Sequence, residues 1–587
     1  MIKGFCVSCK INESMQARAV EHCRMLAGRY GLHTIEFFQN DFSIVLISTT
    51  TECSSFIEGE TIEFSLGQIA QHPTQWDRFL KIKINSVGLH VENDYAGSIP
   101  VFYSPRSGLI LSNIEPCVFL GTGSSLKDLC PESLYGFLRY SHFIWDETAW
   151  VHIKQMLPDS RYIFSTNGEL VSIKYLETIK STDTRSSLSD KKVAEELFEL
   201  NNTLVSRSLK DADEIVLPLS SGYDSRMIFS VLANDKKLAD KTRCFTYGSV
   251  GSIEVEAARR LSQLKHIDWH HVDLPCNFLS KRYLTEISDI FGASLHMHGM
   301  YQIEFYEQIK AKYGISPKSR LTSGFMTGVP AGQHNGLLQI TDSNCCLTDA
   351  MNRFSQSMVW LDADLEKMPI FAGKYYLEKA EERFRLAFDR FDGEVFQKAV
   401  MFDVWTRQRN FISYYPRVFE WLCPISSPHM CAEYANFFMS ISKCHLWNRK
   451  AVELMFLQHY PDISKVASNS NGLASMGSQL ETGLFKLSRI FSRLGIPNPL
   501  PSRYHNAPIE FDLKAVNNCK EVSFYPLLGE ISETRQFIEQ FGGMQMLNDL
   551  YQRSLSGDSL AYAQVVTLQA VALNGLLETS NYGYVNR

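Results

Sequence analysis

The chain has 587 residues, too many for one ordinary hydrophobic core, so its length predicts two or more domains. Hydrophobic residues make up 45% and charged residues 21% of the chain, which are ordinary values for a globular protein. The formal net charge of −6 argues against a protein built mainly to hold nucleic acid and leaves room only for a local basic patch. No window approaches about 18 consecutive apolar residues, so no membrane span is expected. From the charge and the hydropathy together, neither nucleic acid nor a membrane is an expected partner.

The N-terminal stretch MIKGFCVSCKINESMQ has no sustained apolar core, so no signal peptide is expected. The 14 cysteines are scattered, and without an export signal this pattern is typical of reduced thiols in the cytoplasm. Cys6 and Cys9 form an isolated C-x-x-C pair. A structural zinc site needs a second pair of ligands at similar spacing, and since none follows we interpret the segment as a buried strand.

The N-terminal third of the chain is rich in strand patterns. Residues 42–48 form a β-branched apolar run, and residues 80–90 alternate between apolar and polar, as half-buried strands do. Residues 101–103 and 109–112 flank a Pro/Gly turn, which predicts a hairpin. Residues 181–190 are polar, lack a core pattern and are the predicted linker.

The character of the sequence changes after this linker. Residues 191–210 have helical spacing, whereas residues 214–219 and 243–247 are short apolar runs typical of buried strands. This alternation predicts a βαβ unit in a parallel sheet. Beyond about residue 350 the chain is expected to be mostly helical.

The junction VLPLSSGYDSRMIFSVLA at residues 216–233 indicates an anion site. A strand that enters a helix through a short polar loop presents free backbone N–H groups at the positive end of the helix dipole. Gly222 lets the backbone approach an anion closely, and Asp224 would repel a bare phosphate, so we expect it to hold Mg²⁺ on a polyphosphate. The alternative is an ordinary strand-to-helix turn. The hydroxyl donors of the loop are Ser220, Ser221 and Ser225.

This loop lacks the lysine of the G-x-x-x-x-G-K-[ST] phosphate loop. Residues 220–225, Ser-Ser-Gly-Tyr-Asp-Ser, instead resemble the S-G-G-x-D-S loop of ATP pyrophosphatases, with Ser221 in place of the first glycine. Enzymes of that superfamily bind ATP and cleave it between the α and β phosphates. The resemblance therefore implies ATP and Mg²⁺ as ligands, with Asp224 as a metal-binding carboxylate.

Further segments resemble asparagine synthetase-type enzymes within that superfamily. Residues 245–258 resemble their second strand and following helix, and residues 321–332 resemble their later S-G-x-G-x-D-x-x-x-G loop. In the N-terminal half, residues 94–103 and 112–115 resemble the D-x-x-G-x-x-P-L-Y-Y and S-E-I-K stretches of the glutaminase-type domain. These matches fall in the right order and cover most of the chain.

The resemblance implies two domains. Residues 1–180 would form an α+β, Ntn-hydrolase-like αββα sandwich, and residues 190–587 an α/β parallel-sheet ATP pyrophosphatase domain with a largely helical C-terminal region. The family's lysine for the α-phosphate is matched by Lys465, ahead of Gly472, unless Lys465 is a solvated surface residue. Asp224 and Lys465 are then the implied catalytic residues. The implied nucleotide-binding residues are Ser220, Ser221, Gly222, Asp224, Ser225, Thr246, Gly248, Glu254, Ser323 and Gly324.

The sequence departs from the family at the glutaminase site. A class II glutaminase uses an N-terminal cysteine as nucleophile, with its own α-amino group as base. Position 2 here is Ile2, which disfavours removal of Met1, and Cys6 lies roughly 13 Å further along an extended strand. We therefore expect the N-terminal domain not to hydrolyse glutamine. Nitrogen would come from free ammonia or from an amine substrate.

Two further departures concern the synthetase site. Gly328 stands where the family has a second Mg²⁺-binding aspartate, so phosphate oxygens, water, Asp342 or Asp349 would have to complete the metal shell. Phe325 stands at the family's substrate-facing acid or base position. Because phenylalanine cannot transfer a proton, the base must come from elsewhere.

The leading prediction is an ATP-dependent, amide-forming ligase. It would activate a small-molecule or carbohydrate carboxylate as an acyl-adenylate, release pyrophosphate, and let ammonia or an amine displace AMP. One alternative is a catalytically impaired homologue that binds a nucleotide or a partner. A tRNA-modifying ATP pyrophosphatase is a third reading, but the basic groove or catalytic cysteine pair it requires is not evident. A homodimer is a further expectation.

Overall fold

The computed structural model describes most of the chain up to residue 466 and a shorter part beyond it. The described ranges are residues 1–51, 57–58, 60–67, 78–106, 108–180, 185–248, 250–274, 281–292, 302–316, 318–334, 360–371, 375–466 and 538–555, with scattered positions between 468 and 568.

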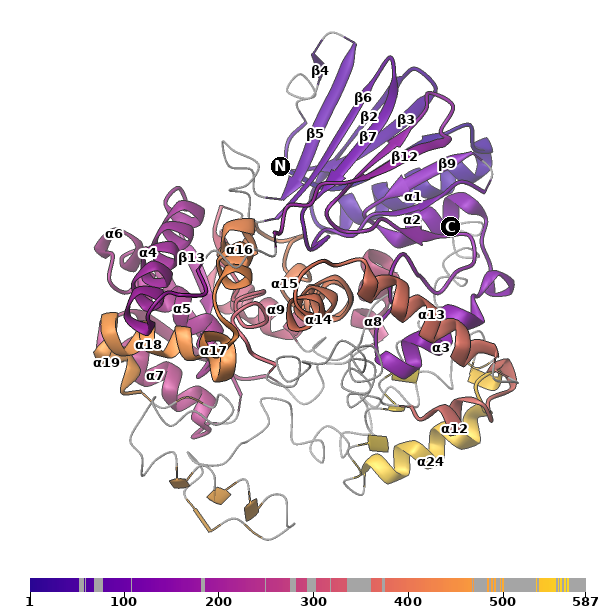
Figure 1. Cartoon of the computed structure of the whole chain (residues 1–587). Helices are drawn as coiled ribbons and strands as arrows, with labels where there is room; N and C mark the ends of the chain where they lie inside the picture. The colour runs from indigo at the N-terminus through magenta and orange to yellow at the C-terminus, as the bar shows by residue number, and fades with distance from the viewer. Residues whose placement is uncertain are drawn as a thin grey trace.

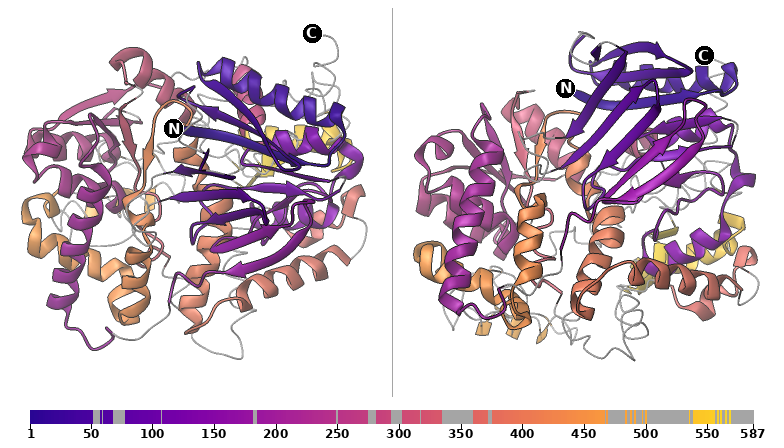
Figure 2. Two further views of the ribbon diagram at one scale, coloured as in Figure 1. Left: turned by 90° about the horizontal axis from the view of Figure 1, so that it is seen from above. Right: turned by 45° about the horizontal axis from the view of Figure 1, so that its top comes forward.

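Two antiparallel sheets form the N-terminal part of the molecule and lie face to face (Figures 1 and 2). The first sheet has the order β10 (Lys154–Gln155), β8 (Phe102–Ser104), β9 (Leu109–Ser112), β1 (Ile2–Cys9), β3 (Phe42–Ser48) and β2 (His33–Gln39). The second has the order β12 (Leu170–Tyr175), β11 (Ser160–Phe164), β7 (Gly88–Asn93), β6 (Phe79–Asn85), β5 (Thr61–Gly67) and β4 (Ile57–Glu58).

The core of this sandwich follows from alternation along the strands. Phe5 and Val7 of β1 face the second sheet, whereas Cys6 faces the helices α1 (Glu13–Arg29) and α2 (Glu115–Thr122) on the outer side. The outer face of the second sheet carries polar pairs such as Lys81 with Glu63 at 2.8 Å. A helix–sheet–sheet sandwich results, and the second helical layer of the expected αββα sandwich is not found in the described ranges.

The strand expectations for this part are largely confirmed. The run at residues 42–48 is β3, the hairpin is β8 with β9, and the C-x-x-C segment is a fully buried strand, β1. Residues 80–90 are not continuous, because the chain turns after Asn85 and forms β6 and β7 as an antiparallel pair. Gly88 follows that turn with φ 141°, a conformation that favours glycine. The prediction of one strand over residues 80–90 therefore missed the turn between β6 and β7.

A five-stranded parallel sheet forms after the linker. Its order is β15 (Asp268–Val272), β14 (Thr242–Tyr247), β13 (Ile215–Pro218), β16 (Arg320–Thr322) and β17 (Ile425–Ser426). Each neighbouring pair is parallel, as the βαβ pattern predicts. Successive strands run from β13 outward to β15, and the order then reverses to β16 on the other side of β13. This reversal makes the gap between β13 and β16 a topological switch point.

Helices cover both faces of the parallel sheet. Ile215 and Leu217 of β13 pack in one core with the helices α4 (Asp190–Leu209), α5 (Tyr223–Leu232) and α7 (Ile253–Lys265). Val216, which points to the other face, packs in a second core with α9 (Gln302–Tyr313). The predicted helix over residues 191–210 is thus α4, and its N-cap is Ser189, whose side chain accepts from the Lys192 N–H.

The later described residues are mostly helical, as expected. α14 (Val395–Asp403) continues into a π-helical stretch, Val404–Ile412. The remaining described helices of four or more residues include α3 (Pro131–Tyr140), α6 (Lys236–Ala239), α8 (Lys281–Phe291), α12 (Asp362–Leu365), α13 (Tyr375–Asp389), α15 (Tyr414–Arg417), α16 (Ala432–Ser440), α17 (Lys443–Leu446), α18 (Lys450–His459), α19 (Pro461–Ser464) and α24 (Gly543–Leu555).

Buried arginine contacts join the N-terminal sandwich to the later helices. Arg409, on the π-helical stretch, is 2% exposed and donates to the carbonyl oxygens of Trp145, at 3.2 Å, and Met156. Burial lowers the pKa of Arg409 to about 10. Among the described residues no other donor reaches these two backbone carbonyls, so this guanidinium satisfies acceptors that burial would otherwise leave unpaired.

The substitution Arg409→Met removes both donors and puts an apolar side chain of similar length in their place. We expect the free energy of unfolding to fall by about 1–3 kcal/mol, because buried carbonyls are left without partners. Arg407→Met is the matched control, since Arg407 is only partly buried and lies over the Phe411 ring at 5.3 Å. Chemical denaturation of both variants measures the difference. Equal losses in the two variants would contradict the role given to Arg409.

Candidate functional site

The carboxyl ends of β13 and β16 meet at the switch point of the parallel sheet. The loop after β13 contains Ser220, Ser221 and Gly222 and leads into α5, and the loop after β16 contains Ser323 and Gly324. In open α/β sheets, ligands bind in the crevice outside the strand ends at such a point. The topology therefore brings together two of the three segments that sequence analysis singled out.

The first turn of α5 keeps free donors. Its N-cap is Gly222, which has no side chain to cap the helix, and no side chain of the described residues accepts from the opening N–H groups. The hydroxyls of Ser220 and Ser225 lie 3.0 Å apart, and the Ser220 N–H donates to Ser225 Oγ at 3.1 Å. The Gly222 N–H donates to Ser220 Oγ at 3.2 Å. The loop is thus internally braced, with its hydroxyls at the positive end of the helix dipole.

Ser221 points inward rather than toward a ligand. It is 0% exposed, and its N–H donates to Glu254 Oε2 at 2.6 Å. Its carbonyl accepts from Arg226 Nη2 at 2.9 Å, and Arg226 Nη1 donates to the Val466 carbonyl at 2.7 Å. Burial lowers the pKa of Arg226 to about 10. Glu254 and Arg226 therefore shape the loop from behind.

Asp224 projects its carboxylate from the first turn of α5. The side chain is 37% exposed and lies 3.4 Å from Arg449 Nη1. Burial raises the pKa of Asp224, and the opposing effects of Arg449 and His334 do not cancel that rise. Arg449 comes from the segment before α18, where Asn448 and Arg449 both have positive φ, 55° and 58°. Two consecutive non-glycine residues in this region are costly, which is typical of functional sites.

Gly324 allows the second loop to touch Asp224. A Cβ at Gly324 would stand 2.8 Å from the backbone carbonyl carbon of Asp224 and 2.9 Å from its Cβ. Real Cβ atoms essentially never come that close to backbone, so only glycine permits this approach. The two loops consequently form one continuous rim.

Gly328 lies where a second carboxylate would face Asp224. A Cβ there would stand 3.1 Å from Asp224 Oδ1. The amide oxygen of Gln333 overlaps the same point. Gln333 is exposed, and its N–H donates to the Gly328 carbonyl at 2.9 Å. An amide oxygen therefore occupies the space that the missing carboxylate leaves.

His334 adds a neutral ring beside this group. Burial lowers its pKa, and the nearby Arg407 and Arg449 act in the same direction. Its Nε2 lies 4.0 Å from Asp403 Oδ2 and has no hydrogen-bond partner in the part of the chain that the structure describes. Burial therefore favours the neutral form of this ring, against the opposing effect of Asp403.

The predicted adenosine-side residues lie at the end of β14. Thr246 is 3% exposed, donates to the Leu219 carbonyl at 2.7 Å and accepts from Trp269 Nε1 at 3.0 Å. Gly248 has φ 125°, and its carbonyl hydrogen-bonds His271 Nε2 at 2.8 Å. These contacts fix the strand end next to the first loop and leave backbone, rather than the Thr246 hydroxyl, to border a ligand.

The remaining predicted residues have different surroundings. Ser323 binds backbone on both sides, since its N–H donates to the Ser426 carbonyl at 2.9 Å and its Oγ accepts from the Phe325 N–H at 3.2 Å. Phe325 is 6% exposed and packs in the core. Lys465 is exposed at the end of α19, next to the Val466 carbonyl that Arg226 binds. The backbone next to Lys465 is thus linked to the loop at residues 220–225 through Arg226, whereas the Lys465 side chain makes no such contact.

Sequence reasoning missed three residues of this site, Arg449, Gln333 and His334. Gln333 and His334 directly follow the glycine-rich segment at residues 321–332. This proximity was the sequence feature that could have indicated that they belong to the site. Arg449 lies far along the chain in a segment without a motif. The alternative metal ligands Asp342 and Asp349 lie outside the described residues.

Comparison with known proteins adds no family assignment, because no family model and no curated protein matches the chain. Within the described ranges, no group of three or more His, Cys, Asp and Glu side chains is arranged to hold a metal ion. The same ranges contain no helix long and apolar enough to span a membrane.

The contact between Gly324 and Asp224 gives a direct test of the site. Gly324→Ala forces backbone atoms apart, so we expect a loss of about 1–3 kcal/mol in the free energy of unfolding. Gly28→Ala is the control, since no atom lies within 4 Å of a Cβ at Gly28, in helix α1. It should stabilise the protein by about 0.5–1 kcal/mol. A Gly324→Ala variant as stable as the parent in urea would disprove the close approach.

Proposed function

We propose that the protein is an ATP-dependent, amide-forming ligase that activates a carboxylate as an acyl-adenylate. The observation that carries this proposal is the uncapped N-terminus of α5 at the switch point, with Asp224 exposed beside it. An uncapped helix end with adjacent hydroxyls favours the β- and γ-phosphates of ATP. The resemblance to asparagine synthetase-type enzymes supports the choice of reaction.

The proposed chemistry has two steps. A carboxylate oxygen of the substrate attacks the α-phosphorus of ATP, and pyrophosphate leaves. The nitrogen of ammonia or an amine then attacks the acyl carbon, and AMP leaves with the carboxylate oxygen. The α5 N–H groups and the Ser220 and Ser225 hydroxyls would orient the pyrophosphate. Arg449 offers a cation beside the developing phosphate charge, a role that the resemblance gives to Lys465.

The residues present fit a bound Mg²⁺ in part. Asp224 Oδ1 and the Gln333 amide oxygen both approach the position where a Gly328 side chain would stand, and both are oxygen ligands of the kind that Mg²⁺ prefers. Phosphate oxygens and water would supply the rest of the shell. When bound with ATP, the ion would neutralise charge on the pyrophosphate leaving group.

The N-terminal sandwich supports a ligase without glutaminase activity. Cys6 is 3% exposed and packs in the helix-facing core, near the Cys23 and Cys117 thiols, which lie 3.5 Å apart. Such a thiol cannot reach glutamine. The Ntn-hydrolase-like fold, the two domains, the cytoplasmic location and the homodimer remain predictions of the sequence.

A nucleotide-binding protein without catalysis is the second candidate. Asp224 is the one carboxylate found at the rim among the described residues, and the ion pair with Arg449 already occupies it. Exchange of labelled pyrophosphate into ATP, with and without a panel of carboxylates, separates the two functions. ATP binding without exchange across the panel favours the second candidate.

Asp224→Asn tests the proposed site. We expect pyrophosphate exchange to fall about hundredfold, because the variant loses the charge that holds Mg²⁺ against the phosphates. Asp240→Asn is the matched control, since Asp240 is exposed at the end of α6 and away from the site. Exchange that survives in Asp224→Asn, at a rate equal to that of Asp240→Asn, rules out the assigned role.

Gln333 and Gly328 allow the metal assignment to be tested through binding alone. Gln333→Ala should raise the Mg²⁺ concentration needed for half-maximal ATP binding, and Gly328→Asp should lower it by about tenfold. The flexible, exposed Gln333 side chain leaves room for the new carboxylate. Calorimetric titration of ATP at a series of Mg²⁺ concentrations gives the midpoints. Unchanged midpoints in both variants would place the ion elsewhere.

A further inference from the structure

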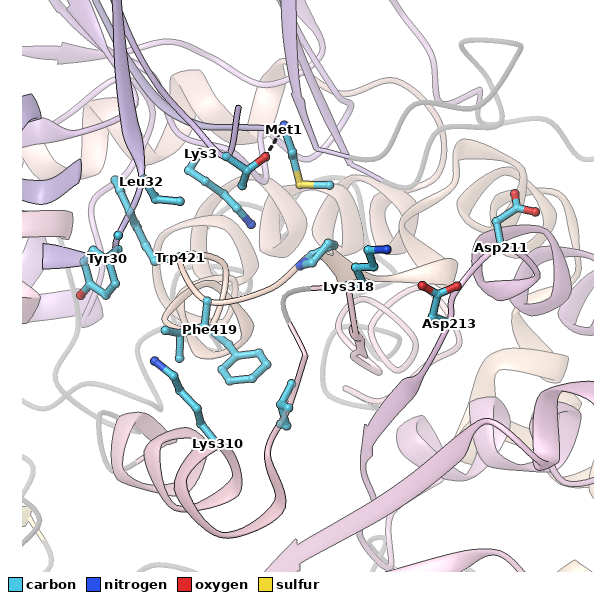
Figure 3. A pocket seen from close by; sticks show the side chains of 15 residues that line it. Met1, Lys3, Tyr30, Leu32, Asp211, Asp213, Lys310, Lys318, Phe419 and Trp421 are labelled. Carbon is cyan, nitrogen blue, oxygen red and sulfur yellow. Dashed lines mark hydrogen bonds between the residues drawn. The ribbon is translucent and has the colours of Figure 1, made fainter. Parts of the chain in front are cut away.

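A pocket of about 660 Å³ lies where the N-terminal sandwich meets the edge of the parallel sheet (Figure 3). It does not include the switch-point loops, so it is separate from the candidate site. Its walls come from both parts of the chain. The lining residues used below are Lys3, Tyr30, Asp211, Asp213, Lys310, Lys318, Phe419 and Trp421.

One end of the pocket is aromatic and cationic. The rings of Tyr30 and Trp421 are tilted by 36° with their centroids 5.3 Å apart, and Phe419 lies on the same side (Figure 3). Lys3 and Lys310 lie at this end too (Figure 3). Asp211 and Asp213 lie together at the opposite end. The pocket therefore offers aromatic, apolar side chains and positive charge at one end and negative charge at the other.

The positive charge at the first end is incompletely balanced. Lys3 is 6% exposed and donates to the Glu420 backbone carbonyl at 2.6 Å. Behind it, the ion pairs of Arg78 and Arg417, each at 3.4 Å, both end on the Glu420 carboxylate. Three buried cations thus gather around one carboxylate. Burial without enough counter-charge is costly, so an anion at this end would be stabilised.

Two further lysines line the pocket and have no side-chain partner among the described residues. Lys310, at the end of α9, and Lys318 make no side-chain hydrogen bond or ion pair in the part of the chain that the structure describes. Both line the pocket. The two exposed aspartates do not pair with them, so the lysine amines are free to bind a ligand.

We propose that this pocket binds a small organic monoanion with a flat apolar body. The body lies against Trp421 and Tyr30, and the anionic group faces Lys3 and Lys310. Asp211 and Asp213 disfavour a second negative charge at the far end. The volume is within the usual range of about 300–1,000 Å³ for small-molecule sites. The inference is independent of the proposed ligase activity.

Calorimetric titration of the full chain with 2-naphthoate, 2-naphthamide and 2,6-naphthalenedicarboxylate tests this proposal. We expect 2-naphthoate to bind about tenfold more tightly than the neutral amide of the same shape. The dicarboxylate should bind more weakly than 2-naphthoate, because its second charge faces the aspartates. Absent binding of 2-naphthoate, equal affinity for the amide, or equal affinity for the dicarboxylate would each overturn the proposal.

Variants then place the ligand in this pocket. The double variant Lys310→Gln with Lys318→Gln should weaken the preference for 2-naphthoate over the amide, while Lys3 still faces the anionic group. Lys312→Gln, an exposed lysine of α9 outside the pocket lining, should leave the preference unchanged. Trp421→Phe should remove the quenching of tryptophan fluorescence by 2-naphthoate while calorimetric binding persists. Quenching that persists in Trp421→Phe, or an equal effect of Lys312→Gln, puts the ligand elsewhere and overturns the assignment.

Discussion

The close approach of Gly324 to the backbone of Asp224 is the constraint on which the candidate site depends. β13 and β16 are neighbours in the sheet, and the strand order reverses between them. The loops that follow these two strands therefore meet at the switch point. A side chain at position 324 would push the loops apart. With glycine there, the uncapped start of α5 and the segment that carries Gln333 and His334 form one rim.

Behind that rim, a buried cation holds the first loop in shape. Arg226 is 0% exposed and joins the Ser221 carbonyl to the Val466 carbonyl, while Glu254 receives the Ser221 N–H. The substitution of glycine by Ser221 is therefore accommodated by a side chain that faces inward. Arg226 also links the loop to the segment that contains Lys465. The buried side chains of Arg226 and Glu254 therefore hold the loop at residues 220–225 in one conformation, and with it the backbone N–H groups at the start of α5.

Local patterns predicted much of the fold, and contacts between distant segments explain most of what they missed. β3, α4 and the β13–α5 junction each lie within one continuous period, so alternation or helical spacing sufficed. The turn between β6 and β7 was missed although the apolar positions shift across it, from residues 80, 82 and 84 to residues 87 and 89. Arg449 could not be predicted, since its contact with Asp224 spans 225 positions and depends on two positive φ angles. The role of Gln333 could not be predicted either, because only the folded chain places its amide oxygen in the space beside Gly328.

The pairing of Asp224 with Arg449 has a consequence for how a polyphosphate would enter the proposed site. Both side chains are partly solvent-accessible, so their attraction is screened and readily exchanged. A polyphosphate offers Arg449 a partner with more charge and bidentate geometry, and it frees Asp224 for the cation that accompanies the phosphates. Each charge keeps an opposite charge through this exchange. The proposed exchange would thus leave neither Asp224 nor Arg449 with an unpaired charge, with or without the ligand.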